Sequence, residues 1–77
     1  MCTLDQLAVG QKAIIESIET DVLPLKLIEM GCLPGNEISL LYLAPFSDPL
    51  YLKIDKVHLA IRKEFARYIM VKLLVND

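Results

Sequence analysis

Apolar and polar residues alternate with a period of two along several short segments of the chain, a pattern typical of β-strands that bury one face. The strands predicted in this way span residues 12–19, 37–44, 50–54, 57–61 and 69–75. In the first of them Ile18 breaks the alternation, which predicts a bulge near Glu16 and Ser17. Five short strands separated by turns predict a mainly all-β domain whose sheet closes into a small barrel. Closure of this kind removes exposed strand edges.

The alternation also assigns each side chain to one face of the sheet. Strand 37–44 is apolar on both faces, because Leu41 and Leu43 lie on the opposite side from its other apolar residues. One face of this strand is therefore expected to meet something other than the core. The residues expected in the core are Ala13, Ile15, Ile38, Leu40, Tyr42, Leu50, Leu52, Ile54, Val57, Leu59, Ile61, Ile69, Val71, Leu73 and Val75.

Turn-forming residues separate the predicted strands. Pro24 suits the first position of a short helix, predicted at residues 24–30, and Gly31 can end this helix in the left-handed conformation. Leu33, Pro34 and Gly35 then fit a type II turn, in which the glycine takes a positive φ. Further turns are predicted at residues 3–10, opened by the capping-box pair Thr3 and Gln6, at residues 55–56 as a hairpin, and at residues 63–66.

Three motifs follow one another along the chain: residues 25–35 read LKLIEMGCLPG, residues 44–49 read APFSDP, and residues 59–66 read LAIRKEFA. Their order and spacing resemble the FeoA family, small cytosolic partners of the bacterial ferrous iron transporter FeoB, over about residues 4–75. The family pattern is close to R-L-x-E-L-G-L-x-P-G, then A-P-x-G-D-P, then A-L-R-x-x-E-A. The resemblance implies one domain over residues 1–77, an SH3-like barrel with one or two short helical insertions.

The matched motifs contain both shared and divergent positions. Lys26 stands where many family members have Arg, and Lys cannot reproduce the forked hydrogen bonds of a guanidinium. Ser47 replaces the glycine usual in the second motif, which predicts either a negative φ or a different loop conformation. Asp55 also stands where glycine is common, and Asp tolerates the left-handed region well. The motif residues expected to have structural roles are Lys26, Gly31, Pro34, Gly35, Pro45, Pro49 and Arg62.

Composition and charge narrow the range of functions. The chain has 77 residues, of which 55% are apolar, more than one small core can hide, so an exposed apolar patch is expected. The net charge is −2 and the basic residues form no stripe, which argues against nucleic acid as a partner. No apolar run approaches the ~20 residues that a membrane helix needs, and the N-terminus does not resemble a signal peptide. We therefore expect a cytoplasmic protein without direct membrane insertion.

Few residues could carry catalysis or bind a metal. His58 is the single histidine and has no accompanying CxxC, HxxxH or carboxylate pair, so a solvated strand residue is the favoured interpretation. Cys2 and Cys32 have no obvious basic neighbour that would favour the thiolate, and we expect reduced, structural thiols. No nucleophile elbow, triad or phosphate loop can be recognised. We expect neither enzymatic activity nor a resident cofactor or metal.

Two charged residues next to turns have local explanations. Asp48 is predicted to accept hydrogen bonds from backbone N–H groups within its own turn. Arg62 directly follows the strand at 57–61, and the favoured interpretation is that it satisfies carbonyls or pairs with a carboxylate at the rim of the barrel. The alternative for Arg62 is a contact with a partner.

The resemblance implies a non-catalytic accessory of ferrous iron transport, which docks on the cytoplasmic part of FeoB and regulates its activity or assembly. One alternative is an SH3-like protein- or peptide-binding module, although the five aromatic residues are spread along the chain rather than gathered for a groove. The other is a stand-alone relative of the C-terminal domain of iron-dependent repressors, which would need a helix-turn-helix and a basic face for DNA binding.

The surface predicted to bind a partner comprises Leu41, Leu43 and Phe46, with Asp48 and Lys53 as its polar rim. FeoB or a second copy of this chain is expected to cover it. The competing interpretation is that the curvature of the barrel or the N-terminal segment covers these side chains.

Overall fold

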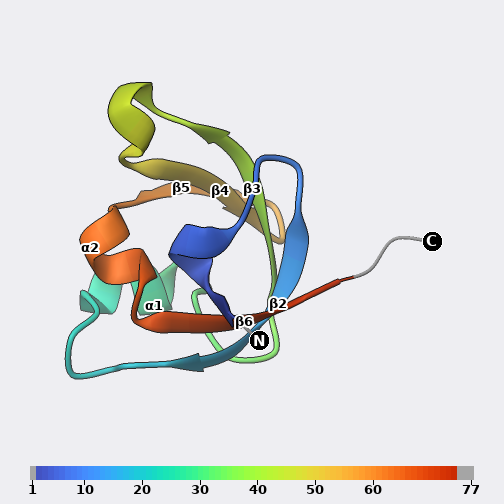
Figure 1. The fold of residues 1–77 in the computed structure, drawn as a ribbon. Coiled ribbons are helices and arrows are strands. Elements are labelled where there is room, and N and C mark those ends of the chain that lie inside the picture. The colour runs from blue at the N-terminus through green and yellow to red at the C-terminus, as the bar shows by residue number, and fades with distance from the viewer. Residues whose placement is uncertain (1, 75–77) are drawn as a thin grey trace.

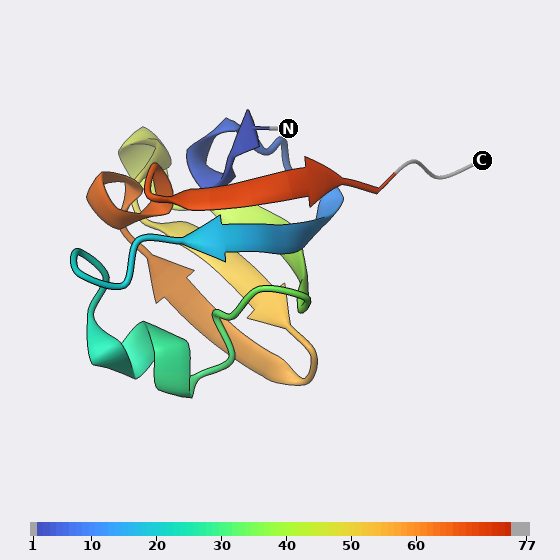
Figure 2. The same ribbon diagram turned by 90° about the horizontal axis from the view of Figure 1, so that it is seen from below.

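A single antiparallel sheet winds around an apolar core in the computed structural model, which describes residues 2–74 (Figures 1 and 2). Six strands hydrogen-bond in the order β1-β6-β2-β3-β4-β5. Val75, one of the residues predicted in the core, lies outside the described residues. Along the chain the elements are β1 (Cys2–Thr3), η1 (Leu4–Gln6), β2 (Lys12–Ile18), α1 (Leu25–Glu29), β3 (Glu37–Leu43), η2 (Pro45–Ser47), β4 (Leu50–Ile54), β5 (Val57–Ile61), α2 (Lys63–Ala66) and β6 (Ile69–Leu73).

The mainly β fold with short helical insertions confirms the prediction from the hydrophobic pattern. All five predicted strands are present, and a sixth, β1, pairs Cys2 with Val71 of β6. A strand of two residues is too short to show an alternation, so the sequence pattern could not reveal it. The strands β1 and β5 end the hydrogen-bonded order and do not pair with each other within residues 2–74, so the sheet curls but both of its edges remain, contrary to the expectation that closure removes them. The helix α2 packs against η1 near these two ends (Figure 1).

The core is formed by apolar side chains alone within residues 2–74, because no polar or charged residue there is buried. Most of the predicted core set is confirmed, and Leu23 and Leu27 add a contribution from α1 and the segment before it. The buried residues are Leu4, Leu7, Ala13, Ile15, Leu23, Leu27, Cys32, Ile38, Leu40, Leu50, Leu52, Ile54, Leu59, Ile61, Ala66, Ile69 and Val71.

Two bulges interrupt the ladders on either side of the sheet centre. In β2 the register against β6 shifts between Ile15 and Ser17, which confirms the predicted bulge. A second shift, between Leu40 and Tyr42 of β3, leaves Leu41 as an extra residue opposite β4. This second bulge was not predicted, and it reverses the expected faces for the end of β3.

Three predicted core residues are instead exposed. Tyr42 lies beyond the β3 bulge, opposite Tyr51 rather than over the core, and is 55% exposed. Val57 begins β5 next to the hairpin turn, and Leu73 ends β6. Side chains at the ends of short strands project past the packed centre of the sheet, so alternation alone overestimates how deeply they are buried.

The turns around α1 have the predicted backbone conformations. Gly31 has φ +104° and Gly35 has φ +95°, and the N–H of Asn36 donates a hydrogen bond to the carbonyl of Leu33 at 3.2 Å. Pro24 was predicted as the first residue of the helix, but its ψ of 137° is extended, so α1 begins one residue later. The short helix itself is confirmed, at residues 25–29 rather than 24–30.

Candidate functional site

Four large apolar side chains that follow one another along the chain are exposed to solvent. Leu41, Tyr42 and Leu43 end β3, and Phe46 lies in η2 with its side chain 101% exposed. We name these four residues the β3–η2 patch. The predicted members Leu41, Leu43 and Phe46 are therefore not covered by the curvature of the sheet. Tyr42, which was predicted in the core, is exposed as well and belongs to the same patch.

The bulge at Leu41 determines which way the side chains of this patch point. Residues directly opposite each other on neighbouring strands share a face. Tyr42 is opposite Tyr51 on the outer face, whereas Leu43 is opposite Leu50, which is fully buried. Leu43 therefore lies on the core side at the end of the sheet, so the prediction that Leu41 and Leu43 continue one face is wrong.

Tyr42 and Tyr51 form an aromatic pair on the outer face. Their ring centroids are 4.6 Å apart and the ring planes are inclined by 15°, a stacked arrangement. Offset stacking of this kind stabilises a pair by about 0.5–1.5 kcal/mol beyond its buried area. The pair was not predicted from the sequence, because Tyr42 was expected in the core and the bulge at Leu41 that turns it outward leaves no mark in the apolar run of residues 40–43.

The loop η2 holds Phe46 in a conformation that is unusual for a large side chain. Phe46 has φ +67° and Ser47 has φ +63°, both in the left-handed region that favours glycine. The prediction of a negative φ at Ser47 is therefore wrong, and the position keeps the backbone conformation that a glycine would suit. Residues held there at a cost of about 1–3 kcal/mol each cluster at functional sites, which makes the exposed Phe46 the most informative residue of the patch.

Asp48 connects this loop to a distant helix. Its Oδ1 accepts a hydrogen bond of 3.0 Å from the backbone N–H of Lys63, the first residue of α2. The predicted backbone hydrogen bond exists, but its donor lies fifteen residues further along the chain and not in the turn of Asp48. The carboxylate therefore helps to position the loop that carries Phe46.

The remaining predicted residues are distributed over the surface. Lys53 lies opposite both Ser39 and His58, on the outer face of β4, and Lys26 is exposed on α1. Arg62 caps the start of α2 with its backbone, since its carbonyl accepts hydrogen bonds from the N–H groups of Phe65 and Ala66. The side chains of Lys26 and Arg62 are both exposed, and neither forms a hydrogen bond with a residue of the patch in the described structure.

The thiols and the histidine do not form a common site in the described structure. Cys32 is fully buried, and desolvation raises the pKa of its thiol to about 11, so it behaves as an apolar core residue at neutral pH. His58 is exposed on β5, as expected. Within residues 2–74, no three His, Cys, Asp or Glu side chains form an arrangement that could hold a metal ion.

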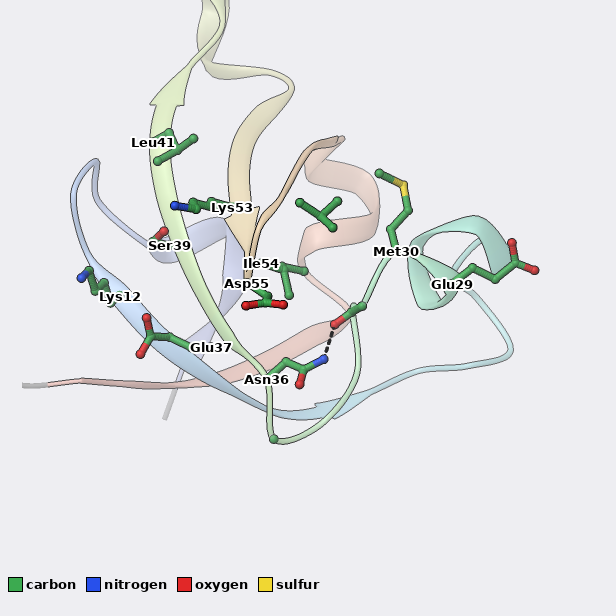
Figure 3. Close-up of a pocket in the computed structure, with 13 residues that line it drawn as sticks. Lys12, Glu29, Met30, Asn36, Glu37, Ser39, Leu41, Lys53, Ile54 and Asp55 are labelled. Atoms are coloured by element: carbon green, nitrogen blue, oxygen red, sulfur yellow. Dashed lines mark hydrogen bonds between the residues drawn. The ribbon is translucent and has the colours of Figure 1, made fainter.

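An open hollow of about 810 Å³ lies between the end of α1 and the strands β3 and β4 (Figure 3). Its charged lining is mixed: Lys12 lies beside Glu37, and Lys53, Glu29 and Asp55 line it as well (Figure 3). Asn36 donates from Nδ2 to the carbonyl of Gly31 at 2.7 Å, which fixes the loop at the floor of the hollow. The mixed charge gives the hollow no clear preference for an anion or a cation.

Comparison with known proteins identifies close relatives of this fold. The family model described as "FeoA domain" matches residues 2–73. A fusion protein of Fe(2+) transport protein A and the Fe(2+) transporter FeoB from Porphyromonas gingivalis is 33% identical over 75 residues. The match covers 96% of this chain but 9% of that protein, so the chain spans about a tenth of the length of this curated relative.

Two solved structures extend the similarity to three dimensions. The iron(II) transport protein A of Clostridium thermocellum has 35% identity and a TM-score of 0.83, over 94% of this chain and 45% of that chain. The FeoA of Stenotrophomonas maltophilia, described as a prokaryotic SH3 domain protein in complex with zinc, has 25% identity and a TM-score of 0.79. That match covers 94% of this chain and 91% of the other. The fold is thus the SH3-like one that the motifs implied.

Proposed function

Because the chain belongs to the FeoA family, we propose that it docks on the cytoplasmic part of a FeoB-type transporter and regulates the activity or assembly of ferrous iron transport. The FeoA domain is an accessory of a transporter and not a catalytic domain. The observation that carries the proposal is the relative in which the two proteins share one polypeptide. A fusion keeps the two parts at high effective concentration, which favours an interaction that separate chains must make by diffusion.

The β3–η2 patch supports this proposal as the docking surface. Its four apolar side chains are all exposed within six consecutive residues of the chain, and Phe46 is presented by a loop that Asp48 ties to α2. Protein interfaces typically centre on a few aromatic or aliphatic anchors surrounded by a polar rim. Asp48 and Lys53 are charged, exposed residues suited to that rim.

The test is to measure binding and ferrous iron uptake with the FeoB protein of the same organism. The double variant Leu41→Ser with Phe46→Ser removes apolar area from the patch and leaves the buried Leu50 and its neighbour Leu43 intact. We expect at least a tenfold loss of affinity, equivalent to about 1.4 kcal/mol, and reduced uptake. Circular dichroism and the urea midpoint establish that the variant remains folded.

A matched control removes two exposed apolar residues elsewhere, Val9→Ser with Leu25→Ser. This control is expected to bind FeoB as the parent does. Equal binding by the patch variant and the parent would reject this surface, and binding lost in the control alone would place the contact near Val9 or near α1. If the folded parent chain itself neither binds FeoB nor alters uptake, the proposed function is wrong.

The alternative of a polyproline-binding module has less support. Such grooves gather several aromatic side chains to receive their ligand. Here Phe65 and Tyr68 are partly buried and pack against the core, while Phe46 lies in η2, so they do not line a groove with Tyr42 and Tyr51.

No helix in the part of the chain that the structure describes is long and apolar enough to cross a membrane.

A further inference from the structure

The last strand of the sheet, β5, has a free edge within the described structure. It pairs with β4 on one side and ends the hydrogen-bonded order on the other. A two-residue turn joins the strands, so the flanking residues Ile54 and Val57 form a hydrogen-bonded pair. The alternation then directs the backbone groups of Leu59 and Ile61 toward β4, whereas those of His58 and Ala60 point to the free edge. The N–H and C=O groups of these two residues are thus oriented to pair with another strand.

An apolar groove runs alongside this edge. It has a volume of about 390 Å³ and connects the outer faces of β3, β4 and β5. Ala60 is its smallest exposed member, and the stacked Tyr42 and Tyr51 form an aromatic wall. We name the backbone edge at His58 and Ala60, together with the groove residues Leu41, Tyr42 and Tyr51, the β5 groove.

The charges around the β5 groove differ from those of the rest of the chain. Residues 53–67 contain five of the eight Lys and Arg residues but two of the ten Asp and Glu residues. This segment therefore carries +3, and since the whole chain carries −2, the remainder carries −5. Lys56 precedes β5 and Arg62 follows it, so a cation stands at each end of the edge.

We propose that the free edge of β5 binds an extended, acidic segment of a partner protein as an additional strand, with an apolar side chain of that segment in the groove beside Ala60. Main-chain hydrogen bonds to a sheet edge give affinity, and pockets for alternate side chains give specificity. The flanking cations select carboxylates on the incoming segment. A second copy of this chain fits poorly, because antiparallel pairing of β5 with itself brings Lys56 of one copy against Arg62 of the other.

This proposal does not depend on docking to FeoB and is tested without it. The probe is the nine-residue capped peptide Asp-Glu-Val-Thr-Val-Thr-Val-Glu-Asp, and the control peptide replaces its four acidic residues with Lys. Binding to the uniformly labelled 77-residue chain is followed by nuclear magnetic resonance and by hydrogen exchange. We expect a dissociation constant at or below about 1 mM for the acidic peptide and binding at least tenfold weaker for the basic one.

The amides of His58 and Ala60 locate the contact. Both are expected to exchange rapidly in the free chain and to become protected at least tenfold when the acidic peptide is bound, because they then donate to it. Ala60→Pro removes an edge donor and leaves the ladder to β4 intact, so it should weaken binding at least tenfold, equivalent to about 1.4 kcal/mol. Ala60→Ser keeps the N–H, so its dissociation constant for the acidic peptide should lie within about twofold of that of the parent.

Several outcomes would overturn the proposal. They are no binding of the acidic peptide at about 5 mM, equal binding of the acidic and basic peptides, protection of amides away from β5, or equal binding by the two Ala60 variants. Dimerisation through β5 would assign the edge to a second copy instead. If Ala60→Pro does not fold, the double variant Lys56→Glu with Arg62→Glu takes its place, and the proposal requires this variant to prefer the basic peptide.

Discussion

The carboxylate of Asp48 accepts a hydrogen bond of 3.0 Å from the backbone N–H of Lys63, which ties the loop after β3 to the first turn of α2. The first N–H groups of a helix have no partner within the helix, and α2 is a single turn without a side-chain cap of its own. One carboxylate thus supplies a hydrogen-bond acceptor for the first N–H of α2 and also holds the loop that presents Phe46.

Replacement of Asp48 by Ala is expected to destabilise the domain by about 0.5–2 kcal/mol, the usual effect of losing a helix cap. Asn retains an acceptor oxygen, so Asp48→Asn should lose clearly less stability than Asp48→Ala. Urea unfolding at pH 7 measures both variants. An unchanged midpoint for Asp48→Ala would mean that the hydrogen bond contributes nothing to stability.

Substitution of the two turn glycines by Val is expected to destabilise the domain by about 1–3 kcal/mol each, since both have positive φ. Gly31→Val should be the worse of the two, because a Cβ there would lie 3.4 Å from Cγ2 of Ile54, whereas nothing lies within 4 Å at Gly35. Chemical denaturation measures the difference. Leu33→Val, in the same loop without a positive φ, is the control; equal losses for all three would contradict the turn assignment.

Ser47→Gly is expected to stabilise the domain. Relief of a non-glycine residue in the left-handed region gains about 1–2 kcal/mol. Glycine loses about 0.5–1 kcal/mol more in backbone entropy on folding, so the net gain is about 0–1.5 kcal/mol, centred on about 0.75 kcal/mol. The matched control is Ser39→Gly in β3, which has no positive φ to relieve and should destabilise. Thermal unfolding compares them, and a loss of stability for both would show that the η2 loop is not strained at Ser47.

The pH dependence of stability should carry a contribution from Cys32. Burial raises the pKa of its thiol from 9.0 to about 11, so the folded state holds this proton more tightly than the unfolded state does. The stability associated with the neutral thiol is present below pH 9 and is lost as the pH rises toward 11. Unfolding free energies measured across this window should fall for the parent and fall less steeply for Cys32→Ala. Parallel curves would argue against the raised pKa.

Most of the strands could be predicted because each buries one face, and burial imposes a period of two on the sequence. The end of β3 could not, because residues 40–43 are all apolar and the pattern looks the same in either register. The partner of Asp48 was also beyond local reasoning, since the donor is fifteen residues away and comes close when the sheet curls. Exposure of Leu41, Leu43 and Phe46 was predicted from an excess of apolar residues. The core position predicted for Tyr42 was wrong, because the bulge turns this side chain outward.

The extra residue at Leu41 inverts parity along β3. Before it, even-numbered positions such as Ile38 and Leu40 face inward; after it, the even-numbered Tyr42 faces outward and the odd-numbered Leu43 faces the core side. In a regular strand of the same sequence, Leu41 would lie opposite Tyr51 and Tyr42 opposite Leu50, so the aromatic pair would be lost and a phenol ring would enter a space that an aliphatic side chain occupies. Deletion of Leu41 would instead keep Tyr42 opposite Tyr51 and Leu43 opposite Leu50, now in an uninterrupted ladder. A single-residue insertion thus allows one short strand to serve two surfaces.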